Sequence, residues 1–185
     1  MKNNKALKVL FLYNGIFVFG GSILGPLYSL YAEGITQSVA AVSILWATYM
    51  FVATIGSLIV ASFGDTIKEK EYLLLAGYLL RAFGWFMFLI AGNFYSLLVV
   101  QVVLGLGEAV GTPAFEVMVA EHIDKNKHVK EYSLWKVLSN VLVAAGAILG
   151  GYLATKFGFT SLFYVMGTLA LISFFGVLLK PRRLL

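Results

Sequence analysis

The residues best suited to chemistry lie in one apolar stretch, residues 99–121, which reads VVQVVLGLGEAVGTPAFEVMVAE. This stretch is long enough to cross a bilayer, since a transmembrane helix needs about 20 residues. It nevertheless contains Gln101, Glu108 and Glu116. An acid at the bilayer centre costs roughly 2.5–3.5 kcal/mol on insertion scales, so a helix that faces lipid has no reason to keep these side chains. We therefore expect a membrane helix that lines an interior polar site.

Small residues in the same stretch predict close contact with neighbouring helices. Gly105, Gly107 and Gly111 would let other backbones approach closely. Pro113 frees a backbone carbonyl, which a nearby group must then satisfy. Both features favour a helix that is packed on other helices.

A second ionisable residue, Arg81, lies near the middle of the apolar segment 72–91. It is about nine residues from the charged end of its segment, and Glu108 is about twelve residues from the corresponding end of its own, so at 1.5 Å per residue their depths differ by about 5 Å. We therefore expect Arg81 and Glu108 to form a buried ion pair. Arg81 could tune Glu108 as a site for a proton or a substrate cation, or the pair could be static and structural.

A second pairing is expected nearer the membrane surface. Glu116 and Lys136 each lie within one or two turns of the same surface, on adjacent apolar segments. They could form an interfacial salt bridge of small energetic value or a gate across the bundle.

The composition identifies an integral membrane protein. Of the 185 residues, 60% are hydrophobic and 12% are charged, whereas a soluble domain has about 25% charged residues. The formal net charge of +5 is spread over the ends of the apolar segments, so it indicates membrane orientation and not nucleic acid as a partner. The sequence has no cysteine, which excludes disulfides and thiolate chemistry.

Six apolar segments predict an all-α, polytopic bundle of six transmembrane helices in a single domain, residues 1–185. Their expected ranges are 9–31, 38–63, 72–91, 94–120, 132–154 and 160–179, each long enough to span about 30 Å of hydrocarbon. Gly25-Pro26 is expected to interrupt the first segment near its outer end. Tyr28 and Tyr31, which follow, are expected to lie in the aromatic belt at the membrane interface.

The basic residues predict the orientation of the bundle. Nearly all of those outside the segments fall on the side that holds both termini and the turns after the second and fourth segments: Lys2, Lys5, Lys8, Lys68, Lys70, Lys125, Lys127, Lys130, Lys180, Arg182 and Arg183. The opposite side has only Lys156. By the positive-inside rule we expect both termini in the cytoplasm, in a multi-pass protein of a bacterial-type plasma membrane.

No residue pattern predicts catalysis. His122 and His128 lie in one charged loop, 121–131, where we interpret them as solvated side chains. There is no Ser/His/Asp arrangement, no phosphate-binding glycine loop and no cluster with metal-ligand spacing. We therefore expect no enzyme activity, no cofactor and no metal site.

In its layout and in several partial motifs, the chain resembles one six-helix half of a major facilitator superfamily transporter. The motifs are the acid Asp65 and trailing Lys70 in the turn after the second segment, Gly105 and Gly107 in the fourth, and Gly146 to Gly151 followed by Phe157-Gly158-Phe159 in the fifth and after it. The resemblance implies transport of a small solute by alternating access between two such halves. It also implies a path lined by the first, fourth and fifth segments, whose polar residues Asn14, Gln101 and Asn140 either bind substrate or hydrogen-bond to neighbours.

The chain also departs from the family pattern at several positions, and the resemblance leaves more than one assembly open. In the turn that holds Asp65, Ala61 stands where the family signature has a glycine, Thr66 where it has a base and Lys68 where it has a second glycine, so an implied gating role of Asp65 rests on a partial signature. In the fourth segment, Gln101 stands where the family often has an arginine. The third segment is usually peripheral in this family, where Arg81 would snorkel or face a partner chain. A homodimer of two half-size chains with one orientation is the first hypothesis; a separate chain that supplies the other half, or a non-transporting scaffold or accessory subunit, is the alternative.

Overall fold

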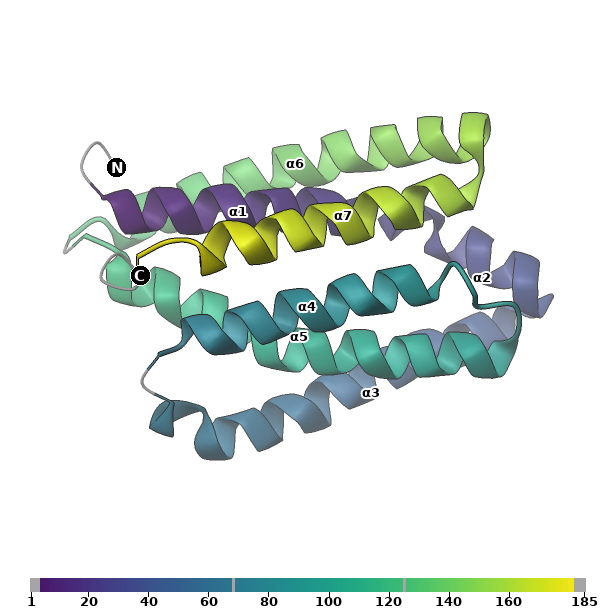
Figure 1. The fold of residues 1–185 in the computed structure, drawn as a ribbon, viewed down its shortest axis with the longest axis horizontal. Coiled ribbons are helices and arrows are strands. Elements are labelled where there is room, and N and C mark those ends of the chain that lie inside the picture. Colours follow the sequence, from purple (N-terminus) through teal and green to yellow (C-terminus); the bar gives the residue numbers. More distant parts are fainter. Residues whose placement is uncertain (1–3, 68, 125, 182–185) are drawn as a thin grey trace.

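In the computed structural model, the chain is an all-α membrane bundle (Figure 1), which confirms the predicted fold class. The structure describes residues 4–67, 69–124 and 126–181, and Asp65 by its backbone alone. The elements are α1 (Lys5–Ser22), the 3-10 turn η1 (Gly25–Leu27), α2 (Tyr28–Thr36), α3 (Val39–Phe63), the 3-10 turn η2 (Gly64–Thr66), α4 (Glu71–Met87), α5 (Phe94–His122), α6 (His128–Phe157) and α7 (Phe159–Leu178). The first membrane crossing is made by α1, η1 and α2 together.

Five of the six crossings are long and apolar enough to span a bilayer, and the exception is α4. This helix has 17 residues and carries Arg81. It lies between α5 and α7, with which it makes extensive contacts. An ionisable residue can therefore be tolerated in α4, because protein and not lipid surrounds its buried face.

Local sequence explains where the helices begin and end. Pro26 stands at the start of η1 and interrupts the first crossing where the sequence predicts. Asn93 caps α5 by accepting a hydrogen bond from the backbone N–H of Ser96, in a reciprocal capping box. Gly158 separates α6 from α7 with a φ of +77°, in the left-handed region that favours glycine.

Several helices are longer than the sequence predicts. The expected turn 33–37 is helical through Thr36, and the left-handed Gln37 ends α2. The expected loop 121–131 is also shorter, because α5 continues to His122 and α6 begins at His128. A helix can continue through charged residues into the water beyond the membrane. The position of charged residues in the sequence therefore does not mark where the helix ends.

The crossings form two groups of three (Figure 1). Helices α1, α6 and α7 pack together in one group, while α3 and α4 pack on α5 in the other. The two groups meet mainly through α4 and α7, with smaller contacts between α1 and α5 and between α2 and α3. The bundle is therefore closed along the seam between α4 and α7 and more open on the side of α1 and α3.

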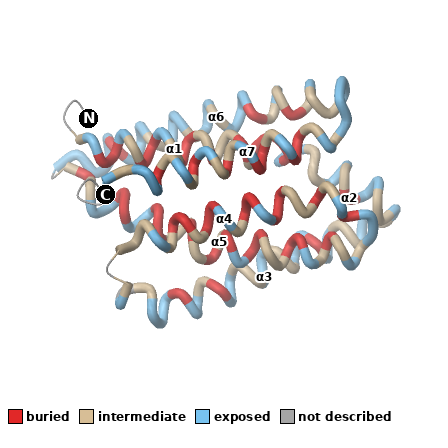
Figure 2. Tube along the Cα trace, in the orientation of Figure 1, coloured by how far each residue is buried: buried red, intermediate tan, exposed pale blue. Residues whose placement is uncertain are grey.

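Burial differs strongly among the helices (Figure 2). In an 18-residue apolar segment of the first crossing, 56% of the residues are buried, whereas the corresponding shares are 17% in α3 and 11% in α6. Apolar side chains such as Phe51, Leu58 and Val141 are exposed on these two helices. In a membrane such surfaces meet lipid or another helix bundle.

Close packing between α1 and α6 depends on glycines. A Cβ atom at Gly146 would lie 2.8 Å from the backbone oxygen of Phe19, and one at Gly150 would collide with the backbone oxygen of Ile23. The G-x-x-x-G spacing of these residues therefore brings the two backbones together.

The start of α1 and the end of α7 lie at the same end of the bundle, together with the turns after α3 and α5 (Figure 1). Lys127 in the second of these turns is paired with Asp124 at 2.8 Å. This hydrogen bond lowers the pKa of the Asp124 carboxyl and raises the pKa of Lys127. Other bases that contribute to the predicted orientation lie outside the described residues: Lys2, Lys68, Lys125, Arg182 and Arg183.

A pair of neighbouring glycines tests the packing of α1 on α6. Gly150→Ala should destabilise the bundle, because its Cβ has no room against Ile23, and overpacking typically costs about 1–3 kcal/mol. Gly151→Ala is the matched control, since nothing lies within 4 Å of a Cβ at that position. Thermal unfolding in detergent should show a lowered midpoint for the first variant and an unchanged or higher midpoint for the second. Equal midpoints would contradict the packing.

Candidate functional site

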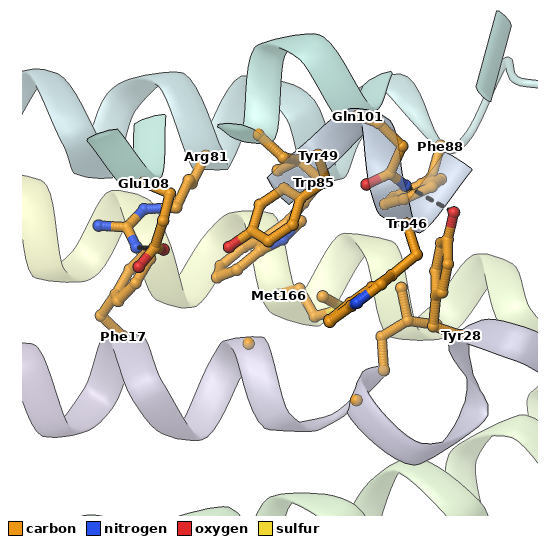
Figure 3. Close-up of a pocket in the computed structure, with 14 residues that line it drawn as sticks. Phe17, Tyr28, Trp46, Tyr49, Arg81, Trp85, Phe88, Gln101, Glu108 and Met166 are labelled. Carbon is orange, nitrogen blue, oxygen red and sulfur yellow. Dashed lines mark hydrogen bonds and ion pairs between the residues drawn. The ribbon is translucent and has the colours of Figure 1, made fainter. Parts of the chain in front are cut away.

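A cavity of about 320 Å³ lies between the two groups of helices. Figure 3 shows its lining, which comes from α1, η1, α2, α3, α4 and α5, with Met166 from α7. Arg81 and Glu108 occupy one end of the cavity, and Gln101 and Tyr28 occupy the other. The volume is at the lower end of the roughly 300–1,000 Å³ typical of small-molecule sites.

The predicted pairing of Arg81 with Glu108 is present. Nη1 of Arg81 lies 2.8 Å from Oε2 of Glu108, and Nε of Arg81 donates to the backbone oxygen of Gly77 at 3.2 Å. The hydroxyl of Thr112, one turn beyond Glu108, donates to Oε1 of Glu108 at 2.8 Å. Both carboxylate oxygens therefore have a donor, as a charge removed from water requires.

Glycines make room for the buried guanidinium. A Cβ at Gly107 would lie 2.6 Å from Cγ of Arg81, and one at Gly111 would lie 2.6 Å from its Nη2. A Cβ at Gly77 would collide with the backbone of Gly111. Two of the glycines predicted to allow close approach, Gly107 and Gly111, thus let α4 and α5 touch, together with Gly77, at a slot that holds Arg81. Arg81 is buried and faces its own bundle rather than lipid.

An aromatic ring completes the surroundings of Arg81. Cζ of Arg81 lies 4.3 Å from the ring centroid of Phe17 on α1, within the range of a cation–π interaction. The ring of Phe17 is in turn 5.1 Å from that of Trp85 and 4.7 Å from that of Tyr78. The ion pair between α4 and α5 is therefore linked to α1 through aromatic contacts.

The opposite end of the cavity is polar but uncharged. Gln101 is buried, and its Nε2 donates to the hydroxyl of Tyr28 at 2.7 Å. The sequence predicts Tyr28 in the interfacial aromatic belt, whereas in the structure Tyr28 lines the cavity. The break at Pro26 is the physical reason, because it starts a new helix at Tyr28 whose direction differs from that of α1 (Figure 1).

Asn14 lies close to the site without lining it. Its Oδ1 accepts a hydrogen bond from the hydroxyl of Tyr78 at 2.9 Å, and both side chains are buried. Asn14 thereby links α1 to α4.

Other candidate residues lie away from the cavity. Asn140 is on α6, which contributes no residue to the lining. Glu116 and Lys136 are both exposed, and no ion pair between them occurs within the described residues. Asp65 belongs to η2, at the end of the bundle where α1 begins and α7 ends, and its side chain lies outside what the structure describes.

The aromatic lining is the part of the site that sequence reasoning missed. Trp46 and Tyr49 on α3, Trp85 on α4 and Phe88 directly after α4 line the cavity together with its charged and uncharged ends (Figure 3). Aromatic residues are common throughout this chain, so composition alone does not separate these four. The i, i+3 spacing of each pair places its members on one helix face, and that spacing is the feature that could have identified them.

The arrangement is suited to binding and proton exchange. Glu108 is the partly accessible member of the ion pair, with 31% of its side chain exposed against 10% for Arg81. Within the described residues, no group of three His, Asp or Glu side chains is placed to hold a metal ion. The site can therefore hold a small molecule between aromatic rings and present a carboxylate to it.

Comparison with known families gives one match. The family model described as Major Facilitator Superfamily matches residues 10–184, which is almost the whole chain. No curated protein matches the chain.

The ion pair can be tested by unpairing it. Arg81→Met should lower the thermal midpoint strongly, because a buried charge left without its partner costs up to about 3–5 kcal/mol. The double variant Arg81→Met/Glu108→Met should recover part of that loss. Lys127→Met, which unpairs the exposed Asp124, is the control and should cost about 0–1 kcal/mol. A double variant no more stable than Arg81→Met would contradict the coupling.

Proposed function

The chain belongs to the Major Facilitator Superfamily, a family of membrane transporters, and on this premise we propose that it moves a small solute across the membrane by alternating access. The observation that carries the proposal is a solute-sized cavity beside a buried ion pair inside a membrane bundle. Ionisable residues within a bilayer are energetically expensive, so a buried pair of them is by default a candidate for a transport pathway. Arg81, Gln101 and Glu108 would contact or orient the solute, with Asn14 supporting them.

A second copy of the chain would complete the path. Helices α3 and α6 are the least buried crossings and expose apolar side chains that a second bundle could cover, and transporters of this family place their substrate path between two six-helix halves. In both copies, the end of the bundle where α1 begins and α7 ends would face the cytoplasm of a cell with a bacterial-type plasma membrane. Rocking of one copy against the other would then expose the cavity to each side in turn.

Two exposed charges would join the copies. Glu116 lies about 9 Å along α5 from its end at His122, and Lys136 lies about 12 Å along α6 from its start at His128, so the two residues are at similar depths. In a twofold interface a contact between residues i and j occurs twice. Glu116 of each copy would pair with Lys136 of the other and close the cytoplasmic side of the path. Asn140, one turn from Lys136, would face the same path, and Asp65 would take part in the same gate.

Proton coupling would act through Glu108. When Glu108 is ionised, Arg81 and Thr112 hold its two oxygens in place. A proton taken up by the carboxylate weakens its hold on Arg81 and changes the charge presented to the solute. Exchange of this proton with water on alternate sides would couple solute movement to the proton gradient.

Coupling can be measured with the solute unknown. Proteoliposomes that contain a pH-sensitive dye should show proton movement when a gradient of one solute class is imposed from a panel of sugars, amino acids, organic anions and organic cations. Glu108→Gln should abolish the proton movement, because a carboxamide neither takes up nor releases a proton near neutral pH, whereas Lys127→Met should leave it unchanged. Proton movement that is undiminished in Glu108→Gln would contradict the role of Glu108.

The dimer can be tested by charge reversal. The native mass in a lipid disc should be that of two 20.2 kDa chains. Glu116→Lys and Lys136→Glu should each lower the dimer fraction several-fold, because like charges would then face each other, and the double variant should restore it. A monomer, or a stoichiometric complex with an unrelated protein, would contradict the homodimer and favour an accessory subunit.

A further inference from the structure

The accessible charge of the cavity is negative. Arg81 is held by Gly77, Glu108 and Thr112 and covered by the ring of Phe17. Arg81 also lines the cavity, but only 10% of its side chain is exposed, against 31% for Glu108. The Glu108 carboxylate is the more exposed partner, and a carboxylate can accept about four hydrogen bonds. The ion pair therefore presents an acceptor to the cavity while the cation beneath it is shielded.

The walls of the cavity are suited to a flat organic cation. The ring centroids of Trp46 and Tyr49 are 5.6 Å apart, and those of Tyr28 and Trp46 are 6.4 Å apart. Trp85 on α4 and Phe88, directly after α4, also line the cavity, so aromatic rings lie along its length (Figure 3). Aromatic faces carry negative potential and attract cations, most strongly in the case of tryptophan. Flat apolar molecules also stack on such rings.

The few polar groups argue against a highly hydroxylated solute. Besides the ion pair, the lining side chains offer the hydroxyls of Tyr28 and Tyr49, the carboxamide of Gln101 and the indole N–H groups of two tryptophans. The Nε2 of Gln101 already donates to Tyr28. A sugar would leave most of its hydroxyls without partners, at a cost for each, whereas an aromatic cation would leave few.

We propose that the solute is a lipophilic organic cation with a flat aromatic body, bound between Trp46 and Trp85 with its charge toward Glu108. This inference rests on the proposed function and deepens it. It also makes the cation and the proton competitors for one carboxylate, so uptake of a proton by Glu108 would release the cation.

Tryptophan fluorescence can test the binding directly. The chain has three tryptophans, and Trp135 is outside the cavity, packed against Phe11 and Phe115. In a Trp135→Phe protein, all tryptophan emission comes from Trp46 and Trp85. The probes are N-methylacridinium, acridine and acridine-9-carboxylate above neutral pH, which share a three-ring body and differ in charge. Each should be titrated into the purified protein in detergent, with emission quenching as the readout.

The cation should bind at least about tenfold more tightly than the neutral and anionic probes, as a single favourable charge contact would provide. Glu108→Gln should reduce this preference to about twofold or less. Trp46→Leu, on the exposed side of α3, should weaken cation binding several-fold even if Glu108→Gln fails to fold, with Trp85 as reporter. A protein that retains only Trp135 is the control for probe that enters the detergent, and it should not discriminate among the probes.

Equal or tighter binding of the anionic or neutral probe would overturn the inference, as would a cation preference that both Glu108→Gln and Trp46→Leu leave unchanged. The outcome is separable from that of the transport proposal. Cation binding without flux in proteoliposomes would support the cation site and contradict transport. Flux of another solute without cation binding would support transport and contradict the cation site.

Discussion

A charge placed in the hydrocarbon region of a membrane must be paired, hydrogen-bonded and shielded, and the central part of this bundle satisfies that constraint for Arg81. The guanidinium needs a carboxylate at its own depth, and Glu108 on α5 supplies one at 2.8 Å. It also needs space between two helices, which Gly77, Gly107 and Gly111 provide by the absence of side chains. The close contact of α4 with α5 is thus inseparable from the ion pair, because a larger residue at any of these glycines would push the helices apart.

The same constraint accounts for the position of the cavity. Helices α4 and α5 are tightly joined, and α4 also packs on α7, so the two groups of three helices are held along one seam. Away from that seam, the aromatic side chains of α1, α2, α3 and α4 surround a space that they do not fill. The partly exposed carboxylate of Glu108 is at one end of this space, and the uncharged pair of Gln101 and Tyr28 is at the other (Figure 3). A polar site can exist in this apolar bundle because Arg81 already neutralises the charge of the Glu108 carboxylate.

Much of the fold could be predicted from the sequence, because length and hydropathy largely determine a membrane crossing. The ion pair could be predicted too, since two ionisable residues at equal depth in a bilayer have few other partners. The identity of the cavity walls could not. Trp46 and Tyr28 are typical of interfacial or lipid-facing residues in composition, and only the three-dimensional path of the chain after Pro26 brings them to the same space. The involvement of α3 rather than α6 likewise follows from helix packing, which no short motif encodes.

The central claim is that the cavity beside Arg81 and Glu108 opens to each side of the membrane in turn. The chain has no cysteine, so a single Leu104→Cys substitution would place one thiol in the cavity lining. A thiol reacts with maleimide as its thiolate, which requires contact with water. In oriented vesicles, a membrane-impermeant maleimide should label this cysteine from either side, and the cationic acridinium should slow both reactions. Labelling from one side only would contradict alternating access, and labelling rates that the cation does not change would contradict the proposed cation site.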